Sequence, residues 1–209
     1  MSADPLPTKR MQVQQLISTN GFMLIGHRGA AGLAPENTLQ SFRFALDWNC
    51  PMVELDVYAC MDKNRQTELV VIHDDKLNRT TTGRGRVMDH SVEHLRRLDA
   101  GGGQQIPRLS EVVALLRRHD REHQSTTTLN IELKGPATAA PTAAALTGME
   151  GVPLLISSFD HEQLALFHQL APAYAVAPLY DRFRPDWQAT AESLQAVAVN
   201  LSARAVNPD

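Results

Sequence analysis

The sequence predicts a parallel α/β fold of the TIM-like (β/α)8 barrel type. Two observations predict it: apolar segments typical of buried strands alternate with helical patterns, and several of these strands end directly in charged side chains. The first example is the apolar run 22–25, which His27 and Arg28 follow closely. With 209 residues, 43% of them hydrophobic, the chain can bury one core, so we expect a single domain over residues 1–209.

The elements follow one another in βα order. After the first strand, residues 37–48 place Leu39, Phe42 and Leu46 on one apolar face at helical spacing. Further strands are predicted at residues 52–57, 69–72, 129–133, 153–158, 174–179 and 196–201. Further helices are predicted at residues 91–98, 110–118, 160–170 and 186–194. Residues 74–107 are rich in Gly, Thr and Arg and predict a short insertion of loops over the barrel mouth.

These patterns make seven strands, whereas a closed barrel of this type needs eight, in about 250 residues. The sequence therefore predicts a barrel truncated after its seventh strand, with the last βα unit missing. Two unpaired sheet edges would result, and a homo-oligomer or a swapped segment could cover them. A predicted helix at residues 9–18 could cover the barrel bottom, but it cannot replace a strand.

Charge and composition exclude several partners. The net charge of -3 comes from 20 basic and 23 acidic residues mixed along the chain, so no basic stripe indicates nucleic acid. Cys50 and Cys60 lack the spacing of a metal knuckle or a disulfide framework, and we expect two reduced thiols. No segment resembles a signal peptide or approaches the ~20 apolar residues of a membrane span. We therefore expect no membrane span and a cytoplasmic protein.

Three carboxylates predict a metal site. Glu54 and Asp56 lie two residues apart on one strand, so both side chains point to the same face, and Glu132 ends a later strand. An all-oxygen set of this kind suits a hard divalent cation, Mg²⁺ or Ca²⁺, with a small-molecule substrate completing the shell. The alternative is that Glu54 and Asp56 only form ion pairs with Lys134 or Arg28 in the barrel interior.

Two histidines predict acid and base chemistry beside the carboxylates. His27 and His73 both follow apolar strands, and in a barrel they would face one another across the site. Imidazole is the side chain whose ordinary pKa makes proton exchange easy near neutral pH. Which histidine is the acid and which the base stays open.

Cationic residues near the same strand ends predict phosphate binding. Arg28 offers a planar fork for two phosphate oxygens, and Lys134 adds a point charge beside Glu132. Glu36 and Asn37 are expected to support the loop that follows Arg28, with Asn37 capping the next helix. A catalytic part for Glu36 stays open.

The ordered motifs resemble the glycerophosphodiester phosphodiesterase family over residues 24–200. The motifs are His27-Arg28-Gly29, Glu36-Asn37-Thr38, Glu54-x-Asp56, His73-Asp74, Arg79-Thr80-Thr81, Ile106-Pro107-Arg108-Leu109 and Glu132-x-Lys134. The resemblance implies that Glu54, Asp56 and Glu132 are metal ligands and that His27 and His73 are catalytic. It also implies hydrolysis of glycerophosphodiesters, such as glycerophosphocholine, to sn-glycerol 3-phosphate and an alcohol.

Three alternatives stay open. One is a related barrel phosphodiesterase that acts on intact phospholipid, although the polar loop region 79–105 lacks an exposed aromatic cluster. Another is a truncated, non-catalytic chain that retains the site residues. The third is a metal-binding regulatory module in which the histidines are dispensable. The preferred head group, the metal and the oligomeric state do not follow from the sequence.

Overall fold

The computed structural model describes residues 9–19 and 22–204. The strands are β1 (Ile25–Gly26), β2 (Met52–Met61), β3 (Thr67–Val71), β4 (Thr128–Leu133), β5 (Leu154–Ser158), β6 (Ala175–Tyr180) and β7 (Asn200–Leu201). The helices are α1 (Lys9–Thr19), α2 (Leu39–Asp47), α3 (Val92–Leu95), α4 (Leu109–His123), α5 (Ala139–Ala145), α6 (His161–Leu170) and α7 (Trp187–Ser193). Two 3₁₀ turns, η1 (Val87–Asp89) and η2 (Leu146–Gly148), complete the elements.

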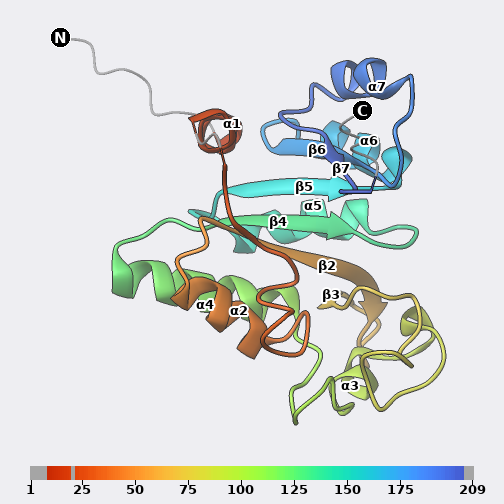
Figure 1. Cartoon of the computed structure of the whole chain (residues 1–209). Coiled ribbons are helices and arrows are strands. Elements are labelled where there is room, and N and C mark those ends of the chain that lie inside the picture. The colour runs from red at the N-terminus through yellow and green to blue at the C-terminus, as the bar shows by residue number, and fades with distance from the viewer. Residues whose placement is uncertain (1–8, 20–21, 205–209) are drawn as a thin grey trace.

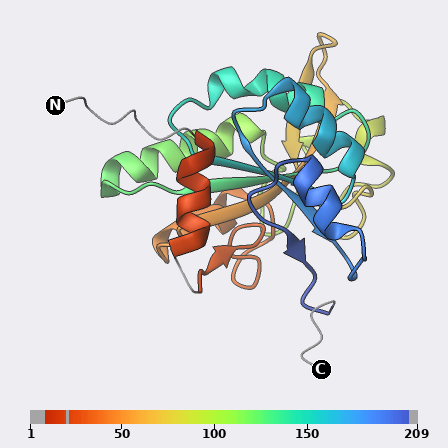
Figure 2. The same ribbon diagram turned by 90° about the horizontal axis from the view of Figure 1, so that it is seen from above.

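The strands form one curled sheet in the order β1-β2-β4-β5-β6-β7, and each neighbouring pair on this path is parallel. Seen from above, green α4, teal α5, cyan α6 and blue α7 follow one another around the strands (Figure 2). This is a half-barrel, as expected for part of a TIM-like fold. No pairing joins β7 to β1 within the described ranges, so the sheet is open there.

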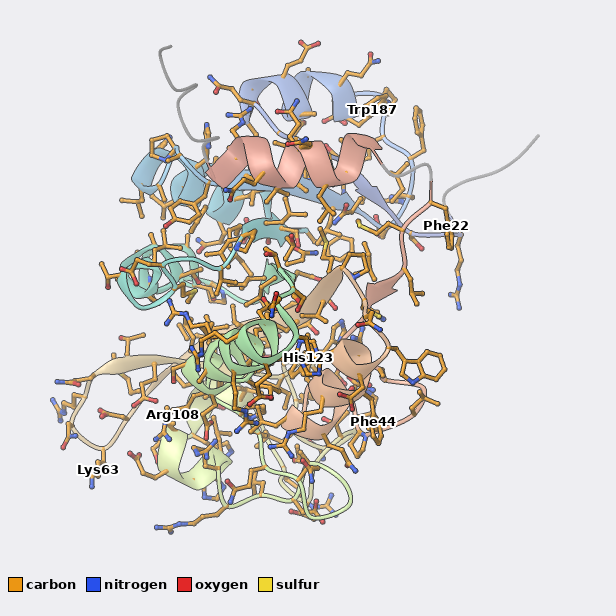
Figure 3. The ribbon with its side chains drawn as sticks, turned by 90° about the vertical axis from the view of Figure 1, so that its left-hand side faces the viewer. Phe22, Phe44, Lys63, Arg108, His123 and Trp187 are labelled. Carbon is orange, nitrogen blue, oxygen red and sulfur yellow. The ribbon has the colours of Figure 1, made fainter. Side chains whose placement is uncertain are left out.

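One strand runs against the prediction. Residues 69–72 were expected to form a parallel barrel strand, but β3 pairs antiparallel with β2. The reason is the short link between them: Asp62 closes a tight turn by accepting the backbone N–H groups of Asn64 and Gln66, and a parallel crossover needs a dozen or more residues. The hairpin tip at Lys63 projects from the body (Figure 3). The chain then returns to the strand ends, where the Ile72 N–H donates to the Asp56 carbonyl at 3.0 Å.

The first strand is also shorter and more exposed than predicted. Only Ile25 and Gly26 pair with β2, while Phe22 is 90% and Leu24 52% exposed. Phe22 lies at the margin of the molecule (Figure 3). The prediction of a buried strand at 22–25 is therefore wrong, because β1 is an edge strand with a neighbour on one side only in the described chain. Gly26 is needed here: a Cβ would come within 2.7 Å of the Ala45 Cβ on α2.

Strand alternation divides the sheet into an apolar outer face and a polar inner face. Outward residues of β2 and β4, such as Val53, Leu55 and Ile131, join Phe42 of α2 and Leu116 of α4 in the main core. The residues between them point inward, and the charged members of this inner set are Glu54, Asp56 and Glu132. The register pairs Asp56 directly with Glu132 on the neighbouring strand. Alternation and register together therefore place the carboxylates side by side.

Two further segments pack against the half-barrel. Val13 of α1 packs with Met52, Leu155 and Ala175 near the amino ends of their strands, which agrees with the predicted helix at 9–18 covering the bottom. Residues 74–107 fold as loops with η1 and α3 beside the β2–β3 hairpin (Figure 1). Leu77 and Val87 of this segment pack against Tyr58, Cys60 and Val70 of the hairpin.

The sequence did not predict α5. Its segment Ala-Ala-Pro-Thr-Ala-Ala-Ala has no amphipathic pattern, and Pro141 argues against a helix interior. Pro141 lies in the first turn of α5, where its missing N–H has no intrahelical partner to lose. The tolerated position of the proline therefore explains the missed helix.

We expect Phe42→Ala to lower the free energy of unfolding by about 3–5 kcal/mol, because Phe42 is fully buried in the main core. Phe22→Ala is the matched control and should stay within about 0.5 kcal/mol of wild type, since its ring is exposed. Urea unfolding of both variants measures the difference. An equal loss in the two variants would contradict the edge position of residues 22–25.

Candidate functional site

Three buried carboxylates form the centre of the candidate site. Glu54, Asp56 and Glu132 each offer one oxygen, and these atoms all lie within 4.8 Å of one another. Glu54 Oε1 is buried and accepts no hydrogen bond from any described residue. A buried carboxylate oxygen without a donor is costly unless a cation or water satisfies it. The oxygen set, its spacing and this orphaned atom fit a hard divalent cation such as Mg²⁺ or Ca²⁺.

The raised pKa values of two of these carboxylates reflect their burial and mutual repulsion. Burial, and next the charge of Asp56, raise the pKa of Glu54 to about 8. Burial raises the pKa of Glu132 to about 7, with Lys134 opposing the shift and Asp56 adding to it. Without a cation, protons therefore neutralise part of this cluster near neutral pH.

Two cations border the carboxylates. Lys134 Nζ contacts Glu132 Oε1 and lies 3.3 Å from Asp56 Oδ1. Arg28 Nε lies 3.6 Å from Asp56 Oδ2, and the Arg28 backbone N–H donates to Glu54 Oε2 at 2.9 Å. The pairing of these carboxylates with Lys134 and Arg28, which the sequence left as an alternative to metal binding, is thus present in the structure. It leaves Glu54 Oε1 unsatisfied, so both can hold.

Asn37 does not cap α2, contrary to the prediction. The N-cap is Thr38, whose Oγ1 accepts the Ser41 N–H at 3.2 Å. Asn37 instead adopts a left-handed backbone with φ of 57° and donates its Nδ2–H to Asp56 Oδ2 at 2.8 Å. The turn that carries the chain from Arg28 into α2 directs this side chain inward, and asparagine tolerates that conformation. Asn37 therefore supports the carboxylate cluster.

The two histidines lie in different surroundings. The His27 side chain is 68% exposed, and its Nε2 lies 3.9 Å from Glu54 Oε2. Partial removal of its ring from water, and then the charge of Arg28, lower the pKa of His27 below its ordinary value, and His73 adds a smaller effect of the same sign. His73 is less exposed, and its Nδ1 lies 2.6 Å from Asp74 Oδ1.

Asp74 and Arg79 are the site residues that sequence reasoning missed. Asp74 contacts His73 directly, and Arg79 forms ion pairs with both Asp74 and Glu36. Both belong to motifs that carry the family resemblance, but the sequence alone predicted no role in the site for either of them. The signal that could have found Asp74 is its position next to His73, since a carboxylate commonly fixes a histidine tautomer.

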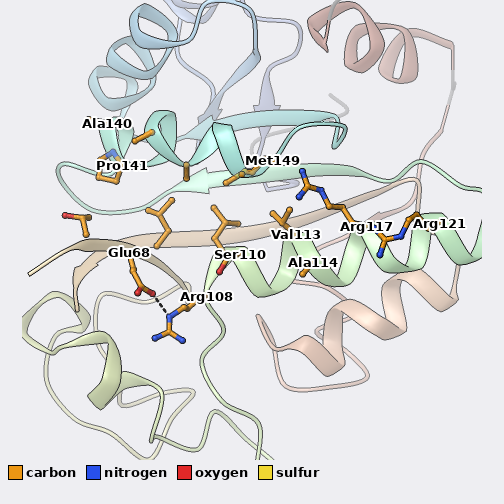
Figure 4. A pocket seen from close by; sticks show the side chains of 16 residues that line it. Glu68, Arg108, Ser110, Val113, Ala114, Arg117, Arg121, Ala140, Pro141 and Met149 are labelled. Atoms are coloured by element: carbon orange, nitrogen blue, oxygen red, sulfur yellow. Dashed lines mark hydrogen bonds and ion pairs between the residues drawn. The ribbon is translucent and has the colours of Figure 1, made fainter. Parts of the chain in front are cut away.

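A separate cavity lies away from the carboxylates. A groove of about 1010 Å³ runs between α4 and α5, lined by apolar side chains such as Val113 and Met149 and by arginines including Arg117 (Figure 4). Arg108 and Glu68 form an ion pair at one end of it (Figure 4). None of the three carboxylates or the two histidines lines this groove, so its size carries no argument for the site.

The described chain gives two further findings. Cys50 and Cys60 are free and buried, as the sequence predicted for reduced thiols. Within residues 9–19 and 22–204, no helix combines the length and apolarity that crossing a membrane requires.

Comparison with known proteins places this geometry in a family. The model of the "Glycerophosphoryl diester phosphodiesterase family" matches residues 27–209. A glycerophosphodiester phosphodiesterase of Bacillus altitudinis is 38% identical over 175 residues, which cover 75% of this chain and 65% of that protein. One of Bacillus subtilis is 31% identical over 192 residues, which cover 79% and 62%. The chain thus spans somewhat less than two thirds of the length of these relatives.

Solved structures agree with the fold. A phosphodiesterase of Oleispira antarctica, solved in complex with the product sn-glycerol-3-phosphate, superposes with a TM-score of 0.79 at 29% identity. The match covers 89% of this chain and 77% of the other.

We expect the metal-free protein to lose stability as the pH rises from about 5 to 8. The raised pKa values of Glu54 and Glu132 mean that the folded state binds these protons more tightly than the unfolded state. Their contribution is therefore full below the ordinary value of 4.5 and is lost as the pH rises through about 7 and 8, by at most about 1.4 kcal/mol per pH unit and group.

Urea unfolding in EDTA across this range measures the slope. Glu54→Gln should flatten it and abolish stabilisation by added Ca²⁺ or Mg²⁺, whereas the exposed Glu122→Gln should behave as wild type. Stability that rises over the same range, or metal stabilisation retained in Glu54→Gln, would contradict the assigned protonation and ligands.

Proposed function

The chain belongs to the glycerophosphoryl diester phosphodiesterase family, and from this premise we propose that it hydrolyses glycerophosphodiesters to sn-glycerol 3-phosphate and an alcohol. The observation that carries the proposal is the buried carboxylate cluster with His27 and two cations beside it, and with His73 close enough to His27 to affect its pKa. The product named for the Oleispira antarctica relative supports the same substrate class.

Arg28 and Lys134 are proposed to bind the phosphodiester. The guanidinium suits two phosphate oxygens, and the ammonium adds a point charge. Both cations already contact Asp56, so the bound phosphate would lie directly beside the carboxylate cluster. Glu54, Asp56 and Glu132 would hold Mg²⁺ or Ca²⁺, and such a cation would supply positive charge beside the non-bridging oxygens.

His27 and His73 are proposed to exchange the protons of the reaction. One imidazole accepts a proton from the nucleophile, either water or the neighbouring glycerol hydroxyl, as the new P–O bond forms; in the second case a water must then open the cyclic phosphodiester to give sn-glycerol 3-phosphate. The other donates a proton to the leaving alkoxide as the bond to the alcohol breaks. The lowered pKa of His27 favours a neutral ring near pH 7, and the division of the acid and base roles between His27 and His73 stays open.

The first experiment measures release of sn-glycerol 3-phosphate from glycerophosphocholine by purified protein in EDTA, Mg²⁺ or Ca²⁺. Lysophosphatidylcholine and phosphatidylcholine, assayed in parallel, test the alternative of intact lipid as substrate. Metal-dependent release from glycerophosphocholine alone supports the proposal. Cleavage only of the lipids would move the assignment to a lipid phosphodiesterase, and no release from folded, monodisperse protein would favour the non-catalytic alternative.

We expect His27→Ala to lower kcat by about 10²- to 10⁴-fold, because it removes one of the two proton-exchanging groups. His94→Ala is the matched control, since His94 is an exposed histidine on α3 and should leave the rate unchanged. Steady-state kinetics with glycerophosphocholine give both values. Near wild-type kcat in His27→Ala would remove His27 from the proposed mechanism.

A further inference from the structure

We propose that Glu36 and Arg79 are positioning residues that link the phosphate-binding Arg28 to the orientation of His73. The inference rests on the proposed function for its meaning in catalysis, and it goes beyond the family motifs by assigning what this pair does. The linked residues are, in order, Arg28, Glu36, Arg79, Asp74 and His73. We call these five residues the relay.

One end of the relay fixes the tautomer of His73. Asp74 Oδ1 lies 2.6 Å from His73 Nδ1. The Arg79 hydrogen bonds, followed by that of His73, hold the pKa of Asp74 well below its usual range, so its carboxylate is ionised and can only accept. The proton must therefore be on His73 Nδ1. The Nε2 of a neutral His73 is left free to accept a proton from a reacting group.

The middle of the relay is Arg79, which divides its guanidinium between two carboxylates. Its Nε donates to Asp74 Oδ2 at 2.6 Å and its Nη1 donates to Glu36 Oε2 at 2.8 Å. Its Nη2 lies 2.9 Å from Asp74 Oδ1 and 2.7 Å from Glu36 Oε1. Three nitrogens are used, and the planar fork fixes the angle between the carboxylates. A lysine could not reproduce this geometry.

The other end of the relay is Glu36, whose Oε1 also accepts from Arg28 Nη1 at 2.9 Å. Glu36 and Arg28 are largely buried, with side chains 18% and 17% exposed. The Glu36 carboxylate therefore binds two arginines: Arg28, which is proposed to bind phosphate, and Arg79, which holds Asp74 against the ring of His73. Arg28 also lies beside Asp56 in the carboxylate cluster. An anion bound by Arg28 would compete with Glu36 for the same guanidinium, and so change the ion pairs of the relay.

The relay explains why residues from distant segments are charged in an alternating order. Arg28 and Glu36 come from the β1–α2 loop, and Arg79 and Asp74 come from the insertion after β3. The Arg79 hydrogen bonds are the largest cause of the lowered pKa of Glu36, so this carboxylate is also ionised. The ion pairs thus join two loops that no strand pairing connects. A loose loop would leave His73 free to rotate.

The test uses the whole protein and four variants, Glu36→Gln, Arg79→Gln, Asp74→Asn and the double variant Asp74→Asn/Arg79→Gln. Arg86→Gln is the matched control: Arg86 lies in the same insertion, and its Nε is 3.3 Å from Asp75, but it has no part in the relay. We expect each single relay variant to lower kcat about 10- to 100-fold with KM changed less than about threefold. The double variant should be no slower than Asp74→Asn alone.

A second measurement does not depend on activity. Imidazole ¹⁵N shifts of the histidine-labelled protein report which His73 nitrogen carries the proton when the ring is neutral. We expect protonated Nδ1 in wild type and Arg86→Gln, and a mixture of tautomers in Glu36→Gln and Arg79→Gln. Wild-type tautomer and wild-type kcat in both relay variants would overturn the inference. If wild type itself releases no product, the proposed function fails, and the ¹⁵N shifts alone still decide the positioning.

Discussion

The structure depends on one electrostatic constraint: three carboxylates must share a buried space of a few ångströms. Like charges at this distance repel strongly in a medium of low polarity, and burial adds a desolvation cost. Glu54 and Glu132 respond by holding protons near neutral pH, while Arg28 and Lys134 supply part of the missing positive charge. The negative charge of the cluster is thus only partly neutralised by the protein's own cations, and this favours binding of a divalent cation.

The sheet creates this condition with little freedom. The inward positions of β2 and β4 meet in register, so Glu54 lies beside Asn130 and Asp56 beside Glu132. The outward residues of the same strands supply the main core with α2 and α4, and their packing fixes the strands that carry the charges. The free-energy cost of the cluster is therefore offset by apolar burial on the opposite face of the same strands.

Much of this could be predicted from the sequence, because alternation and strand ends are local patterns. The strands that carry the carboxylates, β2 and β4, could be predicted in this way, and the structure brings the carboxylates together as expected, whereas β1 and β7 are each reduced to two residues. The direction of β3 could not be predicted, since an apolar run looks the same in a hairpin and a crossover. The contacts of Asn37 and Arg79 could not be predicted for another reason: their partners, Asp56 and Glu36, lie 19 and 43 residues away in the sequence. Side-chain contacts across loops leave no period in the sequence.

The two histidines lie in different surroundings, as the proposed acid and base roles would require. His27 follows a two-residue edge strand, is largely exposed and has Glu54 Oε2 3.9 Å from its Nε2. His73 follows β3, the returning strand of a hairpin. Its ring contacts Asp74, and Asp74 is in turn held by Arg79. Acid and base must differ in protonation at the same pH, so two equivalent imidazoles would serve poorly. The difference arises from topology. The edge strand β1 leaves the ring of His27 exposed, whereas the segment that follows the antiparallel strand β3 places His73 against the Asp74–Arg79 ion pair.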